Sequence, residues 1–250
     1  MHPLFSALLA TSILTLISLV GVFFVGLGTE RLKTVVFVLV AFAAGALLSA
    51  AFFHLLPEAY EHVGYLGGSI AVLVGLSSFF VLERFLHWRH CHHGHCEGHP
   101  YTTLSLMGGA LHNLLDGFVI GGSFLVSPAL GVSTTVVIIA HALPQELGDF
   151  GILVHGGYSK ARALLLNLLT SLPSLAGAAL AYYGMVGRTH WIPYLMGFAA
   201  GTFIYVGSSD LIPEIHKEQN LRKTALAFVF FLLAVVLLLF VAMHGEHEHL

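Results

Sequence analysis

Two apolar segments in the middle of the chain carry residues that bind metals. His112 and Asp116 stand four positions apart, as do His141 and Gln145, and in a helix each pair shares one face. Mixed nitrogen and oxygen ligands of this kind suit Zn²⁺, and also Fe²⁺ or Mn²⁺. A charged residue at the centre of a membrane helix costs about 2.5–3.5 kcal/mol on insertion scales. Several such residues close together therefore require a compensating partner, and a divalent cation is the natural one.

Further polar residues lie beside these ligands. Asn113 and Glu146 are each adjacent to one of them, and Asp149 continues the second stripe one turn further along the chain. Pro144 frees a backbone carbonyl in mid-segment, which is tolerated where the backbone lines a cavity. Intramembrane Asn and Gln can instead be hydrogen-bonding links between helices, and this alternative stays open for Asn113 and Gln145. The predicted metal ligands are His112, Asn113, Asp116, His141, Gln145 and Glu146.

The composition identifies the elements that must position these residues as membrane-spanning helices. The 250 residues are 57% hydrophobic and only 9% charged, with a mean hydropathy of +0.87, whereas soluble domains carry about 25% charged residues. About twenty apolar residues span a bilayer. The sequence therefore predicts an all-α integral membrane protein, one transmembrane domain over residues 1–250, with eight helices. The predicted spans are 4–27, 34–56, 65–88, 103–126, 131–156, 161–184, 191–212 and 223–243.

The basic residues predict the orientation of these helices. We number the connections between successive predicted helices from one to seven. Nine of the ten Lys and Arg residues fall at the first, third, fifth or seventh connection, and Arg188 alone falls at an even-numbered one, between the sixth and seventh helices. Cytoplasmic loops carry the excess of Lys and Arg, so the odd connections are predicted to be cytoplasmic and both termini to lie outside. Compact loops and a short N-terminus favour a prokaryotic plasma membrane.

The chain also repeats itself. Phe42–Gly45 (FAAG) recurs 156 positions later as Phe198–Gly201, and the motif His54–Glu58 (HLLPE) recurs at the same offset as Asp210–Glu214 (DLIPE). The predicted second helix runs outward and the seventh runs inward, so the two motifs lie at opposite membrane faces. This indicates an inverted repeat that relates helices 1–3 to helices 6–8, as in many alternating-access transporters.

The same motifs supply candidates for a transport pathway. His54 and Glu58 are expected at the outer end of the second helix, where they would collect ions. A helix end with interfacial charge is the alternative interpretation. The full set of lower-ranked pathway residues is His54, Glu58, Asp149, Asn167, Asp210 and Glu214.

Residues 89–100 form a His-rich loop between the third and fourth predicted helices, on the cytoplasmic side. Ligands this dense bind transition metals, although the two cysteines do not match the spacing of a structural zinc module. A flexible buffering or sensing loop with reduced thiols is therefore expected. Its candidate ligands are His90, Cys91, His92, His93, His95, Cys96 and His99.

With these residues in view, the chain resembles the ZIP (Zrt/Irt-like) divalent-metal transporters. The resemblance rests on His112-Asn113-x-x-Asp116-Gly117 followed by His141-x-x-Pro144-x-Glu146, and Gly148-Asp149-Phe150 is similar to the subgroup with the HExPHE motif. It implies a transport site built by the fourth and fifth helices and movement of metal toward the cytosol. Zinc is the first expected substrate, with iron, manganese or cadmium as others.

Two positions depart from the subgroup's pattern. Ala142 stands where the subgroup has Glu, and Gln145 where it has His. Some members are described with two adjacent metals, and the position of Ala142 would normally serve the second. A second cation nearby adds strong repulsion that only extra anionic ligands offset. We therefore predict one tightly bound metal here.

Other functions remain as alternatives. A membrane metal sensor without translocation would use the same ligands. An intramembrane metalloprotease requires a motif such as HExxH, which the sequence lacks, and a di-iron oxidoreductase would need its histidine clusters on framework helices. The chain is thus not expected to be an enzyme. Its expected partners are divalent metal ions, the lipid bilayer and, as one option, a second copy in a homodimer. The near-neutral charge of −3 gives no case for nucleic acid.

Overall fold

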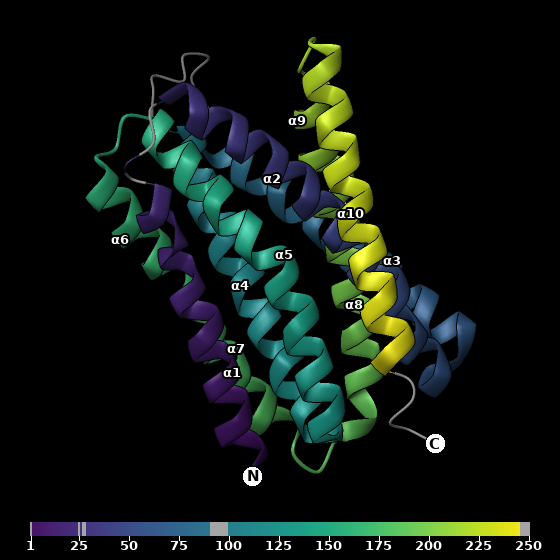
Figure 1. The fold of residues 1–250 in the computed structure, drawn as a ribbon. Helices are drawn as coiled ribbons and strands as arrows, with labels where there is room; N and C mark the ends of the chain where they lie inside the picture. The colour runs from purple at the N-terminus through teal and green to yellow at the C-terminus, as the bar shows by residue number, and fades with distance from the viewer. Residues whose placement is uncertain (1, 25, 27–28, 91–99, 246–250) are drawn as a thin grey trace.

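The computed structural model describes residues 2–24, 26, 29–90 and 100–245, and within these ranges the regular structure is helical throughout. Figure 1 shows the helices side by side in a bundle, with the start of α1 and the end of α10 at its lower end. The elements are α1 (Pro3–Ile17), η1 (Ser18–Phe24), α2 (Thr29–Ala50), η2 (Ala51–Leu55), α3 (Leu56–His90), α4 (Pro100–Val126), α5 (Pro128–His155), α6 (Lys160–Ser171), α7 (Pro173–Met185), η3 (Thr189–Trp191), α8 (Ile192–Tyr205), η4 (Val206–Leu211), α9 (Ile212–His216) and α10 (Leu221–Gly245).

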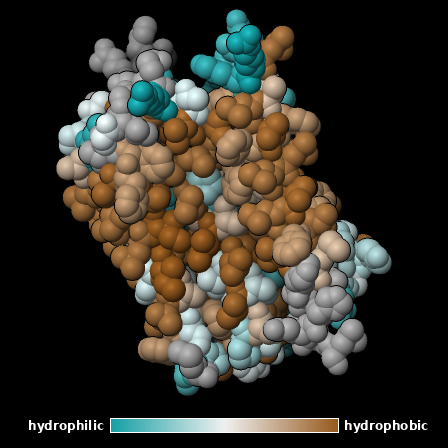
Figure 2. Space-filling view, in the orientation of Figure 1, coloured by the Kyte–Doolittle hydropathy of each residue, from teal (hydrophilic) through white to brown (hydrophobic). Residues whose placement is uncertain are grey.

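Seven helical stretches among the described residues are long and apolar enough to cross a membrane. Their bounds are Pro3–Phe24, Arg31–Phe85, Leu106–Val126, Pro128–Val154, Lys160–Met185, Thr189–His216 and Leu221–Met243. The second stretch, 55 residues long, contains the predicted span 34–56 and most of the predicted span 65–88. It is interrupted at Gly64, where φ is 69° and ψ is 169°, a conformation that glycine adopts without steric cost. On the face shown in Figure 2, an apolar belt separates two more hydrophilic ends. The fold is therefore that of a multi-pass membrane protein.

Glycines bring pairs of helices into backbone contact, as small residues do in membrane interfaces. A Cβ added to Gly117 on α4 would lie 1.8 Å from the Ser174 carbonyl oxygen on α7. One added to Gly201 on α8 would lie 2.1 Å from the Val72 oxygen on α3, and one at Gly45 on α2 would lie 2.4 Å from the Phe231 oxygen on α10. These contacts place α4 against α7, α8 against α3 and α2 against α10.

Two short π-helical segments interrupt the helices at related places. The first, η2, ends two residues before Pro57, and the second, η4, ends two residues before Pro213. Proline has no amide hydrogen to donate to the carbonyl four residues earlier, and a wider turn accommodates the disrupted ladder. Such turns occur frequently at functional sites, and here they contain His54 and Asp210 of the two repeated motifs.

Buried hydroxyl groups join α1 to α6 and α7. Thr15 Oγ1 donates to the Ser171 carbonyl at 3.5 Å, and Ser171 Oγ donates to the Thr15 carbonyl at 3.5 Å. Ser174 Oγ lies 3.2 Å from Thr15 Oγ1, while Ser171 Oγ donates to Ser18 Oγ at 3.1 Å. Each contact made by Thr15 thus has a counterpart made by Ser171.

Candidate metal site

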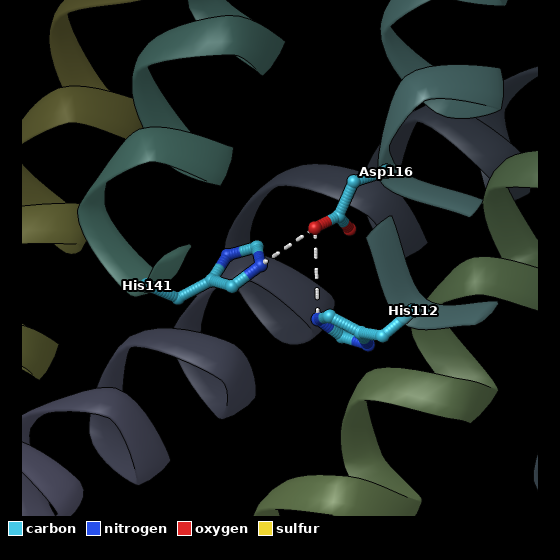
Figure 3. Close-up of side chains that lie close together, drawn as sticks. All are labelled: His112, Asp116 and His141. Atoms are coloured by element: carbon cyan, nitrogen blue, oxygen red, sulfur yellow. Dashed lines mark ion pairs between the residues drawn. The ribbon is translucent and has the colours of Figure 1, made fainter. Parts of the chain in front are cut away.

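The most distinctive polar cluster lies between α4 and α5. Asp116 Oδ2 is 3.6 Å from His112 Nε2 on its own helix and 3.5 Å from His141 Nε2 on α5. Figure 3 shows both imidazole rings directed at this carboxylate. One ligand atom from each residue lies within 4.8 Å of the other two. All three residues are buried, with Asp116 and His141 at 0% exposure and His112 at 3%. The structure thus brings together three of the six predicted ligands.

These three side chains lack hydrogen bonds within the described residues. Both ring nitrogens of His112, both ring nitrogens of His141 and both carboxylate oxygens of Asp116 have no hydrogen-bond partner there. Buried polar groups are normally hydrogen-bonded, and leaving one unpaired costs about 1–3 kcal/mol, more when it is charged. Two imidazoles and a carboxylate offer the mixed nitrogen and oxygen donors that Zn²⁺ accepts. The arrangement is therefore chemically suited to a divalent cation.

Asn113 and Glu146 lie beside the cluster and bond each other. Asn113 Nδ2 donates to Glu146 Oε1 at 3.2 Å and to the Thr170 carbonyl at 3.2 Å. Glu146 Oε2 has no hydrogen-bond partner within the described residues, although the residue is only 4% exposed. The Asn113 amide thus orients one carboxylate oxygen of Glu146 and leaves the other available.

Asn167 of α6 connects three helices behind Glu146. Its Nδ2 donates to the backbone carbonyls of Ser18 and Glu146, at 3.0 Å each. Its Oδ1 has no hydrogen-bond partner in the part of the chain that the structure describes, and the residue is fully buried. Asn167 therefore supports the α5 backbone at the level of Glu146.

Two other predicted residues on α5 lie near this region. Gln145 is half-buried, and its Oε1 has no hydrogen-bond partner within the described residues. Asp149 faces α4, because its Oδ2 would lie 3.6 Å from a Cβ built on Gly109. The α5 helix continues through Pro144, so the proline does not end the element that carries these groups.

An aromatic residue from α8 borders the cluster. The Phe203 ring centroid is 4.8 Å from that of His141 and 5.3 Å from that of His112. The two imidazole centroids are 5.5 Å apart in an edge-on arrangement. Sequence reasoning missed Phe203 because an apolar side chain within an apolar helix carries no ligand signal.

The pathway residues of the two repeated motifs lie away from the cluster. His54 Nε2 is 2.9 Å from Thr134 Oγ1 of α5, and Thr134 is seven residues, or two turns, before His141. Glu58 belongs to a more exposed group with Glu61 and His62, whose ligand atoms lie within 4.8 Å of one another. The sequence analysis did not identify Glu61 and His62, although their spacing from Glu58 by three and four positions is a helix-face signal.

At the other motif, Asp210 and Glu214 are exposed, and Glu214 forms a salt bridge with Lys217. A contact missed from the sequence lies close to this motif, where the Tyr205 hydroxyl donates to Glu83 Oε2 at 2.5 Å. The predicted loop ligands Cys91, His92, His93, His95, Cys96 and His99 lie outside the described residues, as does the side chain of His90.

The fold is a bundle of apolar, membrane-length helices, and the metal-binding groups at its centre lack hydrogen-bond partners among the described residues. These features indicate an integral membrane protein that handles metal ions, and comparisons with known proteins identify its family. The model of the ZIP zinc transporter family matches residues 2–106 and 89–242. The chain belongs to this family.

Curated relatives carry the names of zinc transporters. The chain is 28% identical over 278 residues to zinc transporter ZIP13 of Danio rerio, covering 86% of this chain and 78% of that protein. It is 31% identical to ZIP13 of Pongo abelii, covering 73% and 59%, and 37% identical to zinc transporter SLC39A7 of Canis lupus familiaris, covering 56% and 31%. The chain thus spans less than two thirds of the length of the second and third of these relatives. The family is one of transporters, not of enzymes.

Proposed function

We propose that this protein transports divalent transition-metal cations, zinc first, across a membrane toward the cytoplasm. The observation that carries the proposal is the buried group of His112, Asp116 and His141, whose ligand atoms converge without hydrogen-bond partners within the described residues. Membership of the ZIP zinc transporter family supports it independently. Iron, manganese and cadmium are the other candidate substrates.

Three neighbours complete the proposed site. Gln145 Oε1 and Glu146 Oε2 are buried oxygens without hydrogen-bond partners in the described part of the chain, so either can supply the fourth ligand to a cation held by His112, Asp116 and His141. Asn113 orients Glu146 through its hydrogen bond. With Ala142 in place of a carboxylate, the site holds one metal. The match to the HExPHE subgroup is part of this proposal.

The proposed route passes the two repeated motifs. Metal enters near Glu58 and His54, and His54 contacts the α5 face that carries His141 two turns further on. It leaves past Asp149 toward Asp210 and Glu214, whose exposed carboxylates attract cations released from the centre. Asn167 contributes by holding the α5 backbone.

The proposed topology has eight crossings, with both termini outside. The 55-residue stretch broken at Gly64 is long enough for two crossings. The start of α1 and the end of α10 lie at one end of the bundle (Figure 1), which fits termini on one side. The reciprocal Thr15 and Ser171 contacts, at a separation of 156 residues, and the related positions of η2 and η4 support the inverted repeat.

Three further elements belong to the proposal. The His-rich loop buffers or senses metal on the cytoplasmic side and lies outside the transport route. Two copies of the chain form a homodimer in the bilayer. The host membrane is a prokaryotic plasma membrane on the sequence argument alone, and the relatives described above come from animals.

Flux through purified protein in proteoliposomes tests the function. Vesicles loaded with a zinc-sensitive dye are expected to accumulate zinc faster than protein-free vesicles, with competition by Fe²⁺, Mn²⁺ and Cd²⁺ ranking the substrates. Saturable zinc binding without flux in correctly inserted protein would instead favour a metal sensor. Neither binding nor flux would contradict both interpretations.

A further inference from the structure

Phe203 stands against both histidine ligands without contributing a ligand atom. Its ring centroid is 4.8 Å from that of His141 on α5 and 5.3 Å from that of His112 on α4, while Phe203 itself belongs to α8. The side chain is fully buried. Three helices thus each supply one ring to a single cluster beside Asp116.

The backbone of α8 places this ring with little freedom. Gly201, two residues earlier, brings α8 to backbone contact with α3, since an added Cβ would lie 2.1 Å from the Val72 oxygen. Close-packed interiors leave few voids larger than a water molecule. Phe203 therefore fills the side of the site that faces α8, and a smaller residue would leave a space there that borders on polar groups.

Filling this space has a consequence for the choice of metal. Zn²⁺ accepts four ligands in tetrahedral geometry, whereas carboxylate, carbonyl and water ligands in octahedral geometry suit Mn²⁺. An apolar ring beside both imidazoles limits their rotation and excludes water ligands from that side. Building on the proposed function, we infer that Phe203 is a specificity-determining residue that favours four-coordinate Zn²⁺ over six-coordinate Mn²⁺ at this site.

The test compares zinc and manganese flux through the full chain in proteoliposomes, measured separately at matched concentrations. Phe203→Ala is expected to lower the ratio of zinc to manganese rates by about tenfold, because the hydrophobic shell around a metal site controls the access of solvent to it. Phe203→Leu keeps most of the apolar volume and should retain most of the ratio. Met196→Ala is the matched control, since it removes a large side chain, 1% exposed, from the same helix two turns away. It should leave the ratio unchanged.

A spectroscopic measurement separates this inference from the transport proposal. Co²⁺ absorption reports tetrahedral or octahedral coordination, and subtracting the spectrum of Asp116→Ala, made in each background, isolates the central site from the loop histidines. The difference spectrum should be tetrahedral for the unmodified protein and octahedral for Phe203→Ala. If these spectra are obtained but the protein shows no metal flux in proteoliposomes, the transport function is rejected and the role of Phe203 is kept.

An unchanged metal ratio and an unchanged cobalt spectrum in Phe203→Ala, with both rates lowered equally, would reduce Phe203 to ordinary packing and overturn the inference. If Phe203→Ala does not insert into the membrane, the flux ratio and the cobalt spectrum are measured for Phe203→Val instead. An unchanged ratio and spectrum in that variant overturn the inference equally.

Discussion

Thr15 and Ser171 each donate a side-chain hydrogen bond to the backbone carbonyl of the other, at 3.5 Å in both directions. Their neighbours repeat the relation, because Ser18 donates to the Thr15 carbonyl at 2.7 Å and Ser174 donates to the Ser171 carbonyl at 2.8 Å. A contact set that is unchanged when its two partners are exchanged is what a local two-fold axis produces. In the proposed inverted repeat, such an axis passes between α1 and the break that separates α6 from α7.

A double-mutant cycle with Thr15→Val and Ser171→Ala should give a modest coupling energy. Hydrogen bonds between membrane helices average about 0.6 kcal/mol in such cycles and reach about 1.7 kcal/mol. We expect a value in that range because both residues are buried and each donates to the other. Unfolding of the detergent-solubilised protein measures it, and strictly additive effects would show that the two hydroxyls stabilise the fold independently.

Removing the carboxylate of Asp116 should abolish zinc flux. Asp116→Ala leaves the two imidazoles without the carboxylate that they share, and the flux is expected to fall by more than the 10–100-fold typical of a lost outer-shell partner. Ser123→Ala on the same helix is the control, because Ser123 is equally buried and bonds only its own helix at Val119 among the described residues. Normal uptake by well-inserted Asp116→Ala would exclude this residue from the site.

A methyl group on Gly117 should separate α4 from α7. The added Cβ would lie 1.8 Å from the Ser174 carbonyl oxygen, so we expect Gly117→Ala to lower the unfolding free energy by about 1–3 kcal/mol or more. Gly108→Ala on the same helix has no heavy atom within 4 Å of the new Cβ, and it should be neutral or stabilising by up to about 1 kcal/mol. Thermal unfolding in detergent compares them, and equal melting temperatures would contradict the close contact.

Adding a carboxylate at Ala142 should raise the metal content of the centre. Ala142 is 3% exposed and lies directly after His141 on α5. In Ala142→Glu, a second anion offsets the repulsion between two adjacent cations. Occupancy is expected to rise from one metal toward two, measured by anomalous scattering with the loop histidines and the C-terminal His244, His247 and His249 removed. Two metals between α4 and α5 in the unmodified protein would refute the single-metal prediction.

The cluster of the proposed metal site was predictable because the chemistry of its side chains conflicts with their surroundings. His112, Asp116 and His141 were identified from helical spacing in apolar segments, and the structure brings their ligand atoms within 4.8 Å of one another. The partners of these ligands were not predictable in the same way. Phe203 is one of many apolar residues in α8, and only the packing of that helix against α3 reveals its place beside the imidazoles.

The sequence predicted long apolar helices, but it did not predict their kinks and wide turns. Hydropathy predicted apolar helices of membrane length, but it does not report where a helix bends or widens. A kink at Gly64 divides the 55-residue helical stretch that covers two predicted spans. The repeated motifs are visible in the sequence as Phe42–Gly45 and its copy. The Thr15 and Ser171 contacts, which support the proposed inverted repeat, depend on residues that differ in type and carry no recognisable motif.

The wide turn at η2 also shifts the angular phase of everything that follows it. A π-helical turn contains an extra residue relative to an α-helical turn, and each residue advances a helix by about 100°. A helical wheel drawn continuously from α2 into α3 therefore places Glu58, Glu61 and His62 about one residue's rotation from the direction in which they point. Any substitution series designed from such a wheel would sample the wrong face beyond Leu55, and the same holds beyond Leu211.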